Sequence, residues 1–236
     1  MGDASADVAT TATQVTFPNA GPGQFNTYGE YQFVNEVSEG EFQRLYGRWE
    51  PLVPREVASL FEGAPFRWWI AGGWAAEASG APRRPHADTD VVVLYEDLAA
   101  VRSWLSDFHL WEAHAGSLRP LLAGDELKAG RQGLWVRRDA ESPWVCDLLL
   151  TRSQDGRWLF KRAPQLSLPL SEIGQTIDGI PYLRAPVVLL HKAKALRDRD
   201  QEDFEGMLPR LTDDERAWLA DALAVAHPDH PWRARL

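Results

Sequence analysis

The sequence predicts an α/β protein in which a small mixed β-sheet precedes a helical C-terminal part. Short apolar runs rich in β-branched and aromatic residues, each bounded by turn residues, occupy the middle of the chain. From Pro186 onward the apolar residues recur at helical spacing instead. Hydrophobic residues make up 44% and charged residues 25% of the 236 residues, so a sizeable core is available and wholesale disorder is excluded.

The first 37 residues differ from the rest, and we expect a flexible or partly packed N-terminal extension over 1–37. This segment has no Lys or Arg and is rich in Thr, Ala, Gly and Asn, which is typical of a mobile leader. Its aromatic residues favour some packing on the body: Phe25, Tyr28, Tyr31 and Phe33. We expect the body to divide into a core over 38–184 and a helical part over 185–236.

Local signals place the elements in order. Ser38, with Glu41 three residues later, forms a capping box that begins a helix running to about residue 49. Pro54 opens a second helix as a first-turn proline. A buried strand over 67–71 ends at a Gly-Gly pair, and a helix follows it. The further expected elements are strands over 90–94, 134–137 and 144–150, a helix over 97–105, a hairpin turn at Asp178-Gly179, and a helix after the capping box of Thr212 and Glu215.

The overall composition excludes several classes of protein. The net charge is −9, with 25 Lys plus Arg against 34 Asp plus Glu, so tight sequence-independent binding of nucleic acid is not expected and a cationic or metal-bound ligand is favoured. The one cysteine, Cys146, excludes an internal disulfide framework and a Cys-rich zinc site. No apolar run approaches the roughly 20 residues of a membrane span, and no secretory signal is visible, so we expect a cytoplasmic protein.

Two aspartates before an apolar strand, Asp88 and Asp90, give the strongest indication of chemistry. Alternate residues of a strand point to the same face, so the two carboxylates lie side by side. They repel each other unless cations lie between them, and their hard oxygen ligands suit Mg²⁺. A third acid, Asp147, interrupts the apolar strand over 144–150 and needs a partner, which a shared metal would supply.

The Gly72-Gly73 pair between a strand and a helix is the second indication. Glycines let the backbone approach a ligand closely, and the free N–H groups of the following helix face an anion such as a phosphate. Taken alone, a Gly-Gly pair is usually a turn, and an Asp-x-Asp at the start of a strand is often a solvated edge. The order of strand, Gly-Gly, helix, acids and apolar strand favours the functional interpretation.

Several of these side chains have a simpler interpretation, which stays open at this point. Asp147 could form an ion pair with Arg137 or Arg152. His86 could be a hydrogen-bonded structural histidine. Arg84 could lie in a solvated loop, or it could orient the acids or contact phosphate.

The chain resembles the nucleotidyltransferases of the DNA polymerase β-like superfamily. The pattern that carries the resemblance is Gly72-Gly73-Trp74-Ala75 followed by Arg84-x-His86-x-Asp88-x-Asp90. The similarity is greatest to the antibiotic-modifying branch, the aminoglycoside and lincosamide nucleotidyltransferases, and to uncharacterised bacterial relatives. It extends through Trp144-x-x-Asp147 and Lys192-Ala-Lys194, while Thr89 stands where these relatives usually carry an apolar residue.

The resemblance implies a two-metal site and a nucleotide site. The acids Asp88, Asp90 and Asp147 would hold two Mg²⁺ ions, and Asp147 would be either a metal ligand or the base that takes the proton of the acceptor hydroxyl. Residues from both halves of the body would contact the nucleotide: Gly72, Gly73, Arg84, His86, Lys192 and Lys194.

The two lysines are not equivalent in this scheme. Two residues turn a helix by about 200°, so one helix can direct only one of Lys192 and Lys194 toward the phosphates, and the resemblance favours Lys192. Alternatively, both lysines are solvated and pair with Asp198 or Glu202.

We therefore expect a Mg²⁺-dependent enzyme that transfers a nucleotidyl group, AMP from ATP, to a hydroxyl of a small molecule. The acidic balance favours a cationic acceptor, for example an aminoglycoside-like antibiotic, which would make the protein a resistance factor. Two alternatives stay open: an enzyme that modifies a protein or tRNA, as toxin-type relatives do, and a non-catalytic relative that binds a nucleotide. The sequence does not identify the acceptor, the preferred nucleotide or the oligomeric state.

Overall fold

The computed structural model describes residues 24–25, 31–32, 38–114 and 116–236. The chain divides into two compact units, Met1–Val37 and Ser38–Leu236. In the first unit, Gln24–Phe25 (β1) pairs antiparallel with Tyr31–Gln32 (β2). The rest of the expected extension over 1–37, including Tyr28 and Phe33, lies outside the described residues.

In the second unit, the described strands form one mixed sheet of ten. They are β3 (Trp68–Ile70), β4 (Asp90–Leu94), β5 (His109–His114), β6 (Ser117–Pro120), β7 (Gly133–Arg137), β8 (Trp144–Gln154), β9 (Arg157–Leu159), β10 (Ser167–Pro169), β11 (Gly174–Ile177) and β12 (Ile180–Leu183). The main order is β11-β12-β3-β4-β8-β7-β5-β6, and β9 joins β8 to β10. The pairs β12-β3 and β4-β8 are parallel and the others are antiparallel.

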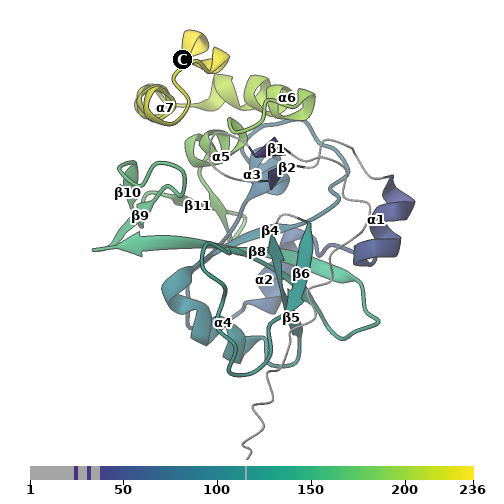
Figure 1. Cartoon of the computed structure of the whole chain (residues 1–236). Coiled ribbons are helices and arrows are strands. Elements are labelled where there is room, and N and C mark those ends of the chain that lie inside the picture. Colours follow the sequence, from purple (N-terminus) through teal and green to yellow (C-terminus); the bar gives the residue numbers. More distant parts are fainter. Residues whose placement is uncertain (1–23, 26–30, 33–37, 115) are drawn as a thin grey trace, which may run out of the picture. The chain divides into compact units, whose positions relative to one another are not determined.

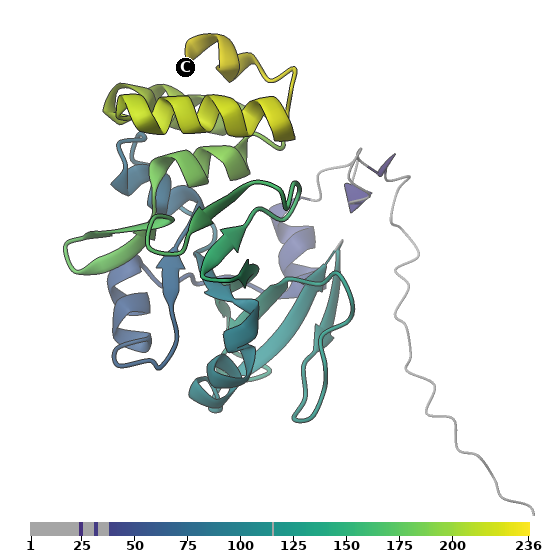
Figure 2. The same cartoon turned by 90° about the vertical axis from the view of Figure 1, so that its left-hand side faces the viewer.

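Helices lie on both sides of this sheet. They are α1 (Glu39–Tyr46), α2 (Pro54–Leu60), α3 (Gly72–Ala78), α4 (Leu98–Trp104), α5 (Ala185–Lys192), α6 (Asp198–Met207) and α7 (Asp213–Ala226). Figure 1 shows α3, α5, α6 and α7 together on one side of β4 and β8, with α2 and α4 on the other. Figure 2 shows the yellow-green α7 lying over α5. None of the described helices is long and apolar enough to cross a membrane.

The predicted α/β class with a mixed sheet is confirmed, and several local signals act as expected. The Ser38 hydroxyl accepts a hydrogen bond from the Glu41 N–H, and Thr212 forms the full capping box with Glu215. Asp178 and Gly179 both have positive φ, 51° and 80°, which is the backbone of a two-residue hairpin turn between β11 and β12.

The first helix is shorter than predicted. It ends at Tyr46 and not near residue 49, because Gly47 adopts a φ of 89°. The residues after it run extended, and Trp49 bridges to Trp144 at the start of β8. This places the segment after α1 beside the strand that carries Asp147.

The sheet is larger than the small one expected, because β5 and β6 extend it beyond β7 and β9 and β10 extend it from β8. The sequence does not predict β5 or β6. In β5 a charged residue, Glu112, interrupts the apolar residues, and the structure buries it fully. Arg119 lies directly opposite Glu112 on β6 and donates to its carboxylate at 2.6 Å. Burial opposes the charge on Glu112, but Arg119 and the Lys128 backbone N–H hold its pKa below the usual value. The strand therefore depends on a cross-strand ion pair.

The core is densest around β4, which lies near the centre of the sheet. Residues Val91, Val92, Val93 and Leu94 are all buried, as expected for a strand covered on both faces. Helix α5 is similarly apolar, with Val187, Val188, Leu189 and Leu190 buried. The N-terminal end of β4 and the C-terminal end of α5 are the points where this core gives way to charged residues.

Candidate active site

Asp90 and Asp147, two of the predicted site acids, lie side by side. Asp90 begins β4 and Asp147 lies within β8. The two strands are parallel, and Asp90 is directly opposite Asp147. The Asp147 N–H donates to the Thr89 carbonyl at 2.9 Å, which fixes this register. Opposite residues of paired strands point to the same face, so both carboxylates face the same way. Asp88 precedes them on an exposed, extended segment.

The pKa values of Asp90 and Asp147 are both raised. Burial, together with the charges of Asp88 and Asp147, raises the pKa of Asp90 well above its ordinary range. Burial and the charge of Asp88 raise the pKa of Asp147 to about 7, although hydrogen bonds from Trp135 and the Leu134 backbone oppose the shift. Repulsion among the carboxylates therefore adds to the effect of burial at Asp90 and Asp147.

The donor chemistry at these acids fits a divalent cation. Oδ1 of Asp147 is buried and has no hydrogen-bond partner among the described residues. A cation near it would satisfy that oxygen and offset the mutual repulsion of the acids. Within the described ranges, however, no three His, Cys, Asp or Glu side chains are arranged as a metal-binding group as they stand. The fit therefore rests on the orphaned oxygen and the paired acids, and the assignment of all three acids to a metal stays a prediction.

The Gly72-Gly73 pair lies against the site side chains. Gly72 has a φ of 57°, and a Cβ at this position would collide with the carboxylate of Asp90. A Cβ on Gly73 would come within 2.5 Å of Nδ1 of His86. Helix α3 begins at Gly72 itself. Both glycines are therefore required by the close approach of site residues, and contact with a triphosphate stays a prediction.

His86 has the surroundings of a hydrogen-bonded structural histidine. Its Nε2 lies 3.1 Å from Oε2 of Glu77, and its ring packs on Trp74 with centroids 4.0 Å apart. Trp74 in turn donates from its indole nitrogen to the Thr89 hydroxyl at 3.1 Å, and Thr89 donates to the Leu52 carbonyl at 2.6 Å. The hydroxyl of Thr89 is thus fully used, which explains how a polar residue is buried between two acids. A role for His86 at the nucleotide stays a prediction.

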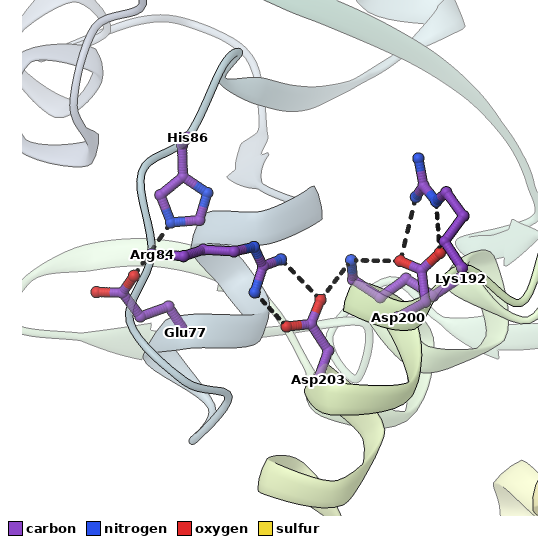
Figure 3. A network of polar contacts seen from close by, with 7 residues as sticks. Glu77, Arg84, His86, Lys192, Asp200 and Asp203 are labelled. Carbon is purple, nitrogen blue, oxygen red and sulfur yellow. Dashed lines mark hydrogen bonds and ion pairs between the residues drawn. The ribbon is translucent and has the colours of Figure 1, made fainter. Parts of the chain in front are cut away.

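Arg84 and Lys192, both predicted to contact the nucleotide, meet at one buried carboxylate. Figure 3 shows the guanidinium of Arg84 in a two-pronged contact with Asp203 of α6, with Nη2 at 2.8 Å from Oδ2. Nζ of Lys192 lies 2.7 Å from Asp203 and 3.1 Å from Asp200. Arg197 donates to Asp200 at 2.6 Å. We call these five residues the ionic cluster.

The two lysines have different surroundings. Lys192 is nearly buried and pairs with Asp200 and Asp203, so the alternative that it is solvated and pairs with Asp198 or Glu202 is wrong. Lys194 is not on the helix as predicted, because α5 ends at Lys192 and Ala193 caps it. The helical-phase argument for choosing between the lysines therefore does not apply. A contact of either lysine with phosphate stays a prediction.

Sequence reasoning gave no role to Asp200 and Asp203. Both are fully buried, and Arg197 and Lys192 hold the pKa of Asp200 below its usual value against the opposing effect of burial. A signal was available, because Asp200, Asp203, Phe204 and Met207 recur at spacings of three and four residues. Two acids on the apolar stripe of a helix indicate buried ion pairs.

Aromatic rings adjoin the acids at strand β7, which pairs with the strand that carries Asp147. Trp135 lies directly opposite Asp147 on β7, and its ring is 5.0 Å from Trp49 and 5.5 Å from Trp144. We call the connected set the aromatic wall: Phe42, Tyr46, Trp49, Trp111, Trp135 and Trp144. Trp144 is buried, whereas the other five rings are partly exposed.

The ion pairs considered for Asp147 are both wrong. Arg137 instead lies over the rings of Trp111 and Trp144, 4.8 and 4.3 Å from their centroids. Arg152 lies 4.4 Å from the ring centroid of Tyr95. Neither guanidinium pairs with Asp147 in the described part of the chain, so its charge is left for another partner.

The comparisons with known proteins point to one family. Residues 54–120 match the aminoglycoside-2''-adenylyltransferases. This segment contains the Gly72-Gly73 pair, Arg84, Asp88 and Asp90. The match confirms the predicted resemblance to the antibiotic-modifying nucleotidyltransferases and the enzyme class that it implies. Asp147 and the C-terminal helices lie outside the matched segment.

Solved structures resemble the chain only distantly. ANT(2")-Ia in complex with adenylyl-2"-tobramycin is 13% identical, covers 72% of this chain and 94% of its own, and has a TM-score of 0.48. Lincomycin-bound LnuA, a lincosamide antibiotic adenylyltransferase, is 17% identical, covers 69% of this chain and 100% of its own, and has a TM-score of 0.47. At these scores the likeness carries no argument about function. No curated protein matches the chain significantly.

Proposed function

We propose that the chain transfers AMP from ATP to a hydroxyl of a small cationic molecule, such as an aminoglycoside-like antibiotic. The observation that supports this most is the pairing of Asp90 with Asp147 against Gly72, in a chain whose residues 54–120 match aminoglycoside-2''-adenylyltransferases. In this proposal the core over 38–184 carries the acids, the part over 185–236 closes the nucleotide site, and the enzyme acts in the cytoplasm.

The reaction is an in-line substitution at phosphorus. The acceptor oxygen forms a bond to the α-phosphorus, the bond from that phosphorus to the bridging oxygen breaks, and pyrophosphate leaves with the electron pair. The hydroxyl proton must go to a base. Asp147 suits this role because its pKa of about 7 lies near neutral pH and its Oδ1 has no other partner among the described residues.

Asp88 and Asp90, with Asp147 as a further ligand or as the base, would hold Mg²⁺. When bound, Mg²⁺ supplies positive charge that offsets the triphosphate and the leaving pyrophosphate. The chain's own contribution is positional. Gly72 leaves room for the Asp90 carboxylate, and the register of β4 and β8 holds Asp147 beside it.

The acceptor is proposed to lie on the aromatic wall, next to Asp147. The ionic cluster fills the opposite side with its own ion pairs, whereas five rings of the wall are partly exposed. Flat rings stack on sugar rings, and their faces together with nearby carboxylates attract ammonium groups. A polyamine sugar satisfies both requirements.

The test is transfer to a panel of acceptors. The full chain is incubated with Mg²⁺ and each nucleoside triphosphate, with aminoglycosides, lincosamides and neutral sugars as acceptors, and products are weighed by mass spectrometry. We expect one AMP on a cationic aminosugar, and none with Asp90→Asn. If no small molecule gains AMP but a protein or tRNA in a lysate does, the alternative of a macromolecular target replaces this proposal.

A further inference from the structure

One carboxylate, that of Asp203, contacts two cations that lie far apart in the sequence. Asp203 accepts two hydrogen bonds from Arg84, in the loop that leads to the acids, and an ion pair from Lys192, at the end of α5. Asp203 is fully buried, and the side chain of Lys192 is only 9% exposed. A buried carboxylate is tolerated only when it is paired, so these three groups depend on one another.

The backbone fixes Asp203 in relation to that loop. Gly206, three residues after Asp203 on α6, lies so close to the loop that a Cβ there would be 2.7 Å from the Gly80 carbonyl oxygen. It would also be 2.9 Å from Cα of Ala81. Helix α6 therefore contacts the loop twice. Gly206 packs on its start at Gly80, and Asp203 binds Arg84 in its middle. The position of Arg84 is set by both contacts.

The ionic cluster adjoins the site. A Cβ on Gly73 would be 3.4 Å from Nη2 of Arg84, so this guanidinium lies beside the Gly72-Gly73 turn. The charges of Lys192 and Arg197 act on Asp90 and lower its pKa, against the stronger effects of burial and the other acids. The cluster holds three cations and two carboxylates, which leaves a positive excess next to the acids.

We propose that Asp203 is a positioning residue that holds Arg84 beside Gly73 and Lys192 next to Arg84, so that both cations meet the triphosphate. The inference rests on the nucleotide site of the proposed function. Because Asp203 acts through Arg84 and Lys192, it does not itself touch the nucleotide. A tie between α6 and the loop that served stability alone would leave the affinity for nucleotide unchanged in every folded variant.

The test compares Asp203→Asn with Glu202→Gln in the full chain. Both changes remove one negative charge from neighbouring residues of α6, but Glu202 is exposed and Asp203 is buried. Calorimetry measures the dissociation constant for Mg²⁺·ATP, and thermal melting checks that each variant is folded. We expect Asp203→Asn to bind ATP at least tenfold more weakly and Glu202→Gln to bind within twofold of the parent.

Two further variants keep the inference testable if Asp203→Asn does not fold. Arg84→Lys retains the charge but loses the two-pronged contact, and we expect it to weaken ATP binding several-fold in a folded protein. The double variant Arg84→Lys/Asp203→Asn should bind ATP no more weakly than the poorer single variant, because both act through one contact. ATP binding like the parent in folded Asp203→Asn, or in Arg84→Lys, overturns the inference.

These outcomes separate the inference from the proposed function. If the parent transfers AMP but Asp203→Asn binds ATP normally, the function stands and the positioning role is wrong. If no acceptor is modified but Asp203→Asn still weakens ATP binding tenfold, the positioning role stands and the transfer reaction is wrong. If the parent does not bind Mg²⁺·ATP at all, both fail.

Discussion

The acids have two very different neighbours, the ionic cluster on one side and the aromatic wall on the other. In the cluster, Asp200 and Asp203 are fully buried, and each is paired with more than one cation. In the wall, Trp49, Trp111 and Trp135 are partly exposed and meet mostly edge to face, with ring centroids 5.0 to 6.5 Å from those of their neighbours. Buried charges fix positions strictly because an unpaired partner is costly, whereas rings can shift against one another at little cost.

This difference suggests a division of roles. A rigid charged side suits a ligand that does not vary, such as the triphosphate, and an adaptable aromatic side suits acceptors of varied shape. Substitutions at the acids, in the ionic cluster and in the aromatic wall test this division of roles.

The largest effect should come from the acids. Asp90→Asn should reduce the rate of AMP transfer by at least about a thousandfold, because a carboxylate that would hold Mg²⁺ at the reacting phosphate is lost. The melting temperature in metal-free buffer should stay level or rise, because repulsion among the acids is relieved. Rate assays and melting curves on the same preparation check both. Turnover near that of the parent would sink the nucleotidyl-transfer proposal.

Next comes the charged side. Lys192→Met leaves Asp200 and Asp203 short of one partner in a buried place, so the free energy of unfolding should fall by about 3 kcal/mol. Urea unfolding measures this. The matched change Lys194→Met, at a half-exposed position after the helix, should cost less than about 1 kcal/mol. An equal loss of unfolding free energy in both variants would show that the buried ion pairs of Lys192 do not contribute to stability.

The charge on Asp147 should make stability depend on pH. Its pKa is raised from 3.8 to about 7 in the folded protein, so the unfolded chain releases this proton first as pH rises. The folded state should therefore lose about 1–2 kcal/mol between pH 4 and 7 in metal-free buffer, after allowance for solvent. Asp147→Asn should make this slope shallower, and Asp90, whose pKa is also raised, should account for what remains. A parent protein that is equally stable at both pH values would contradict it.

The aromatic side should give the smallest effect, and a selective one. Trp135→Ala should raise the Michaelis constant for the acceptor up to about tenfold, since one ring contact is worth about 1 kcal/mol, and leave that for ATP unchanged. Trp135→Phe keeps a ring and should stay within about threefold. Steady-state kinetics with each substrate varied in turn measure the Michaelis constants for the acceptor and for ATP separately. A change in the constant for ATP alone would place the nucleotide on this side instead.

Local signals in the sequence were sufficient for much of the fold. The Asp178-Gly179 turn and the Thr212 capping box depend on a few neighbouring residues, and both form as predicted. The placement of Asp88 and Asp90 on one face assumed that both lie in the strand, but β4 begins at Asp90, so this placement stays a prediction. The link between Asp147 and Asp90 came from chemistry, since a lone carboxylate in an apolar strand needs a partner, and the resemblance then supported it.

The errors share one cause, which is compensation by distant residues. Strand β5 was missed because Glu112 is buried there only through Arg119 on the next strand. Thr89 looked out of place because the partners of its hydroxyl come from elsewhere. The ion pairs of Lys192 with Asp200 and Asp203 could not be predicted locally, because the two acids lie on another helix.

Gly72 has a consequence for how such a protein can change over generations. Every amino acid except glycine carries a Cβ, and the space for one at this position is taken by the Asp90 carboxylate. No codon change that alters the residue can therefore keep the geometry of the acid pair. Changes in the range of substrates must therefore arise at positions that tolerate other side chains. A saturation library at position 72, selected for activity, should return glycine alone.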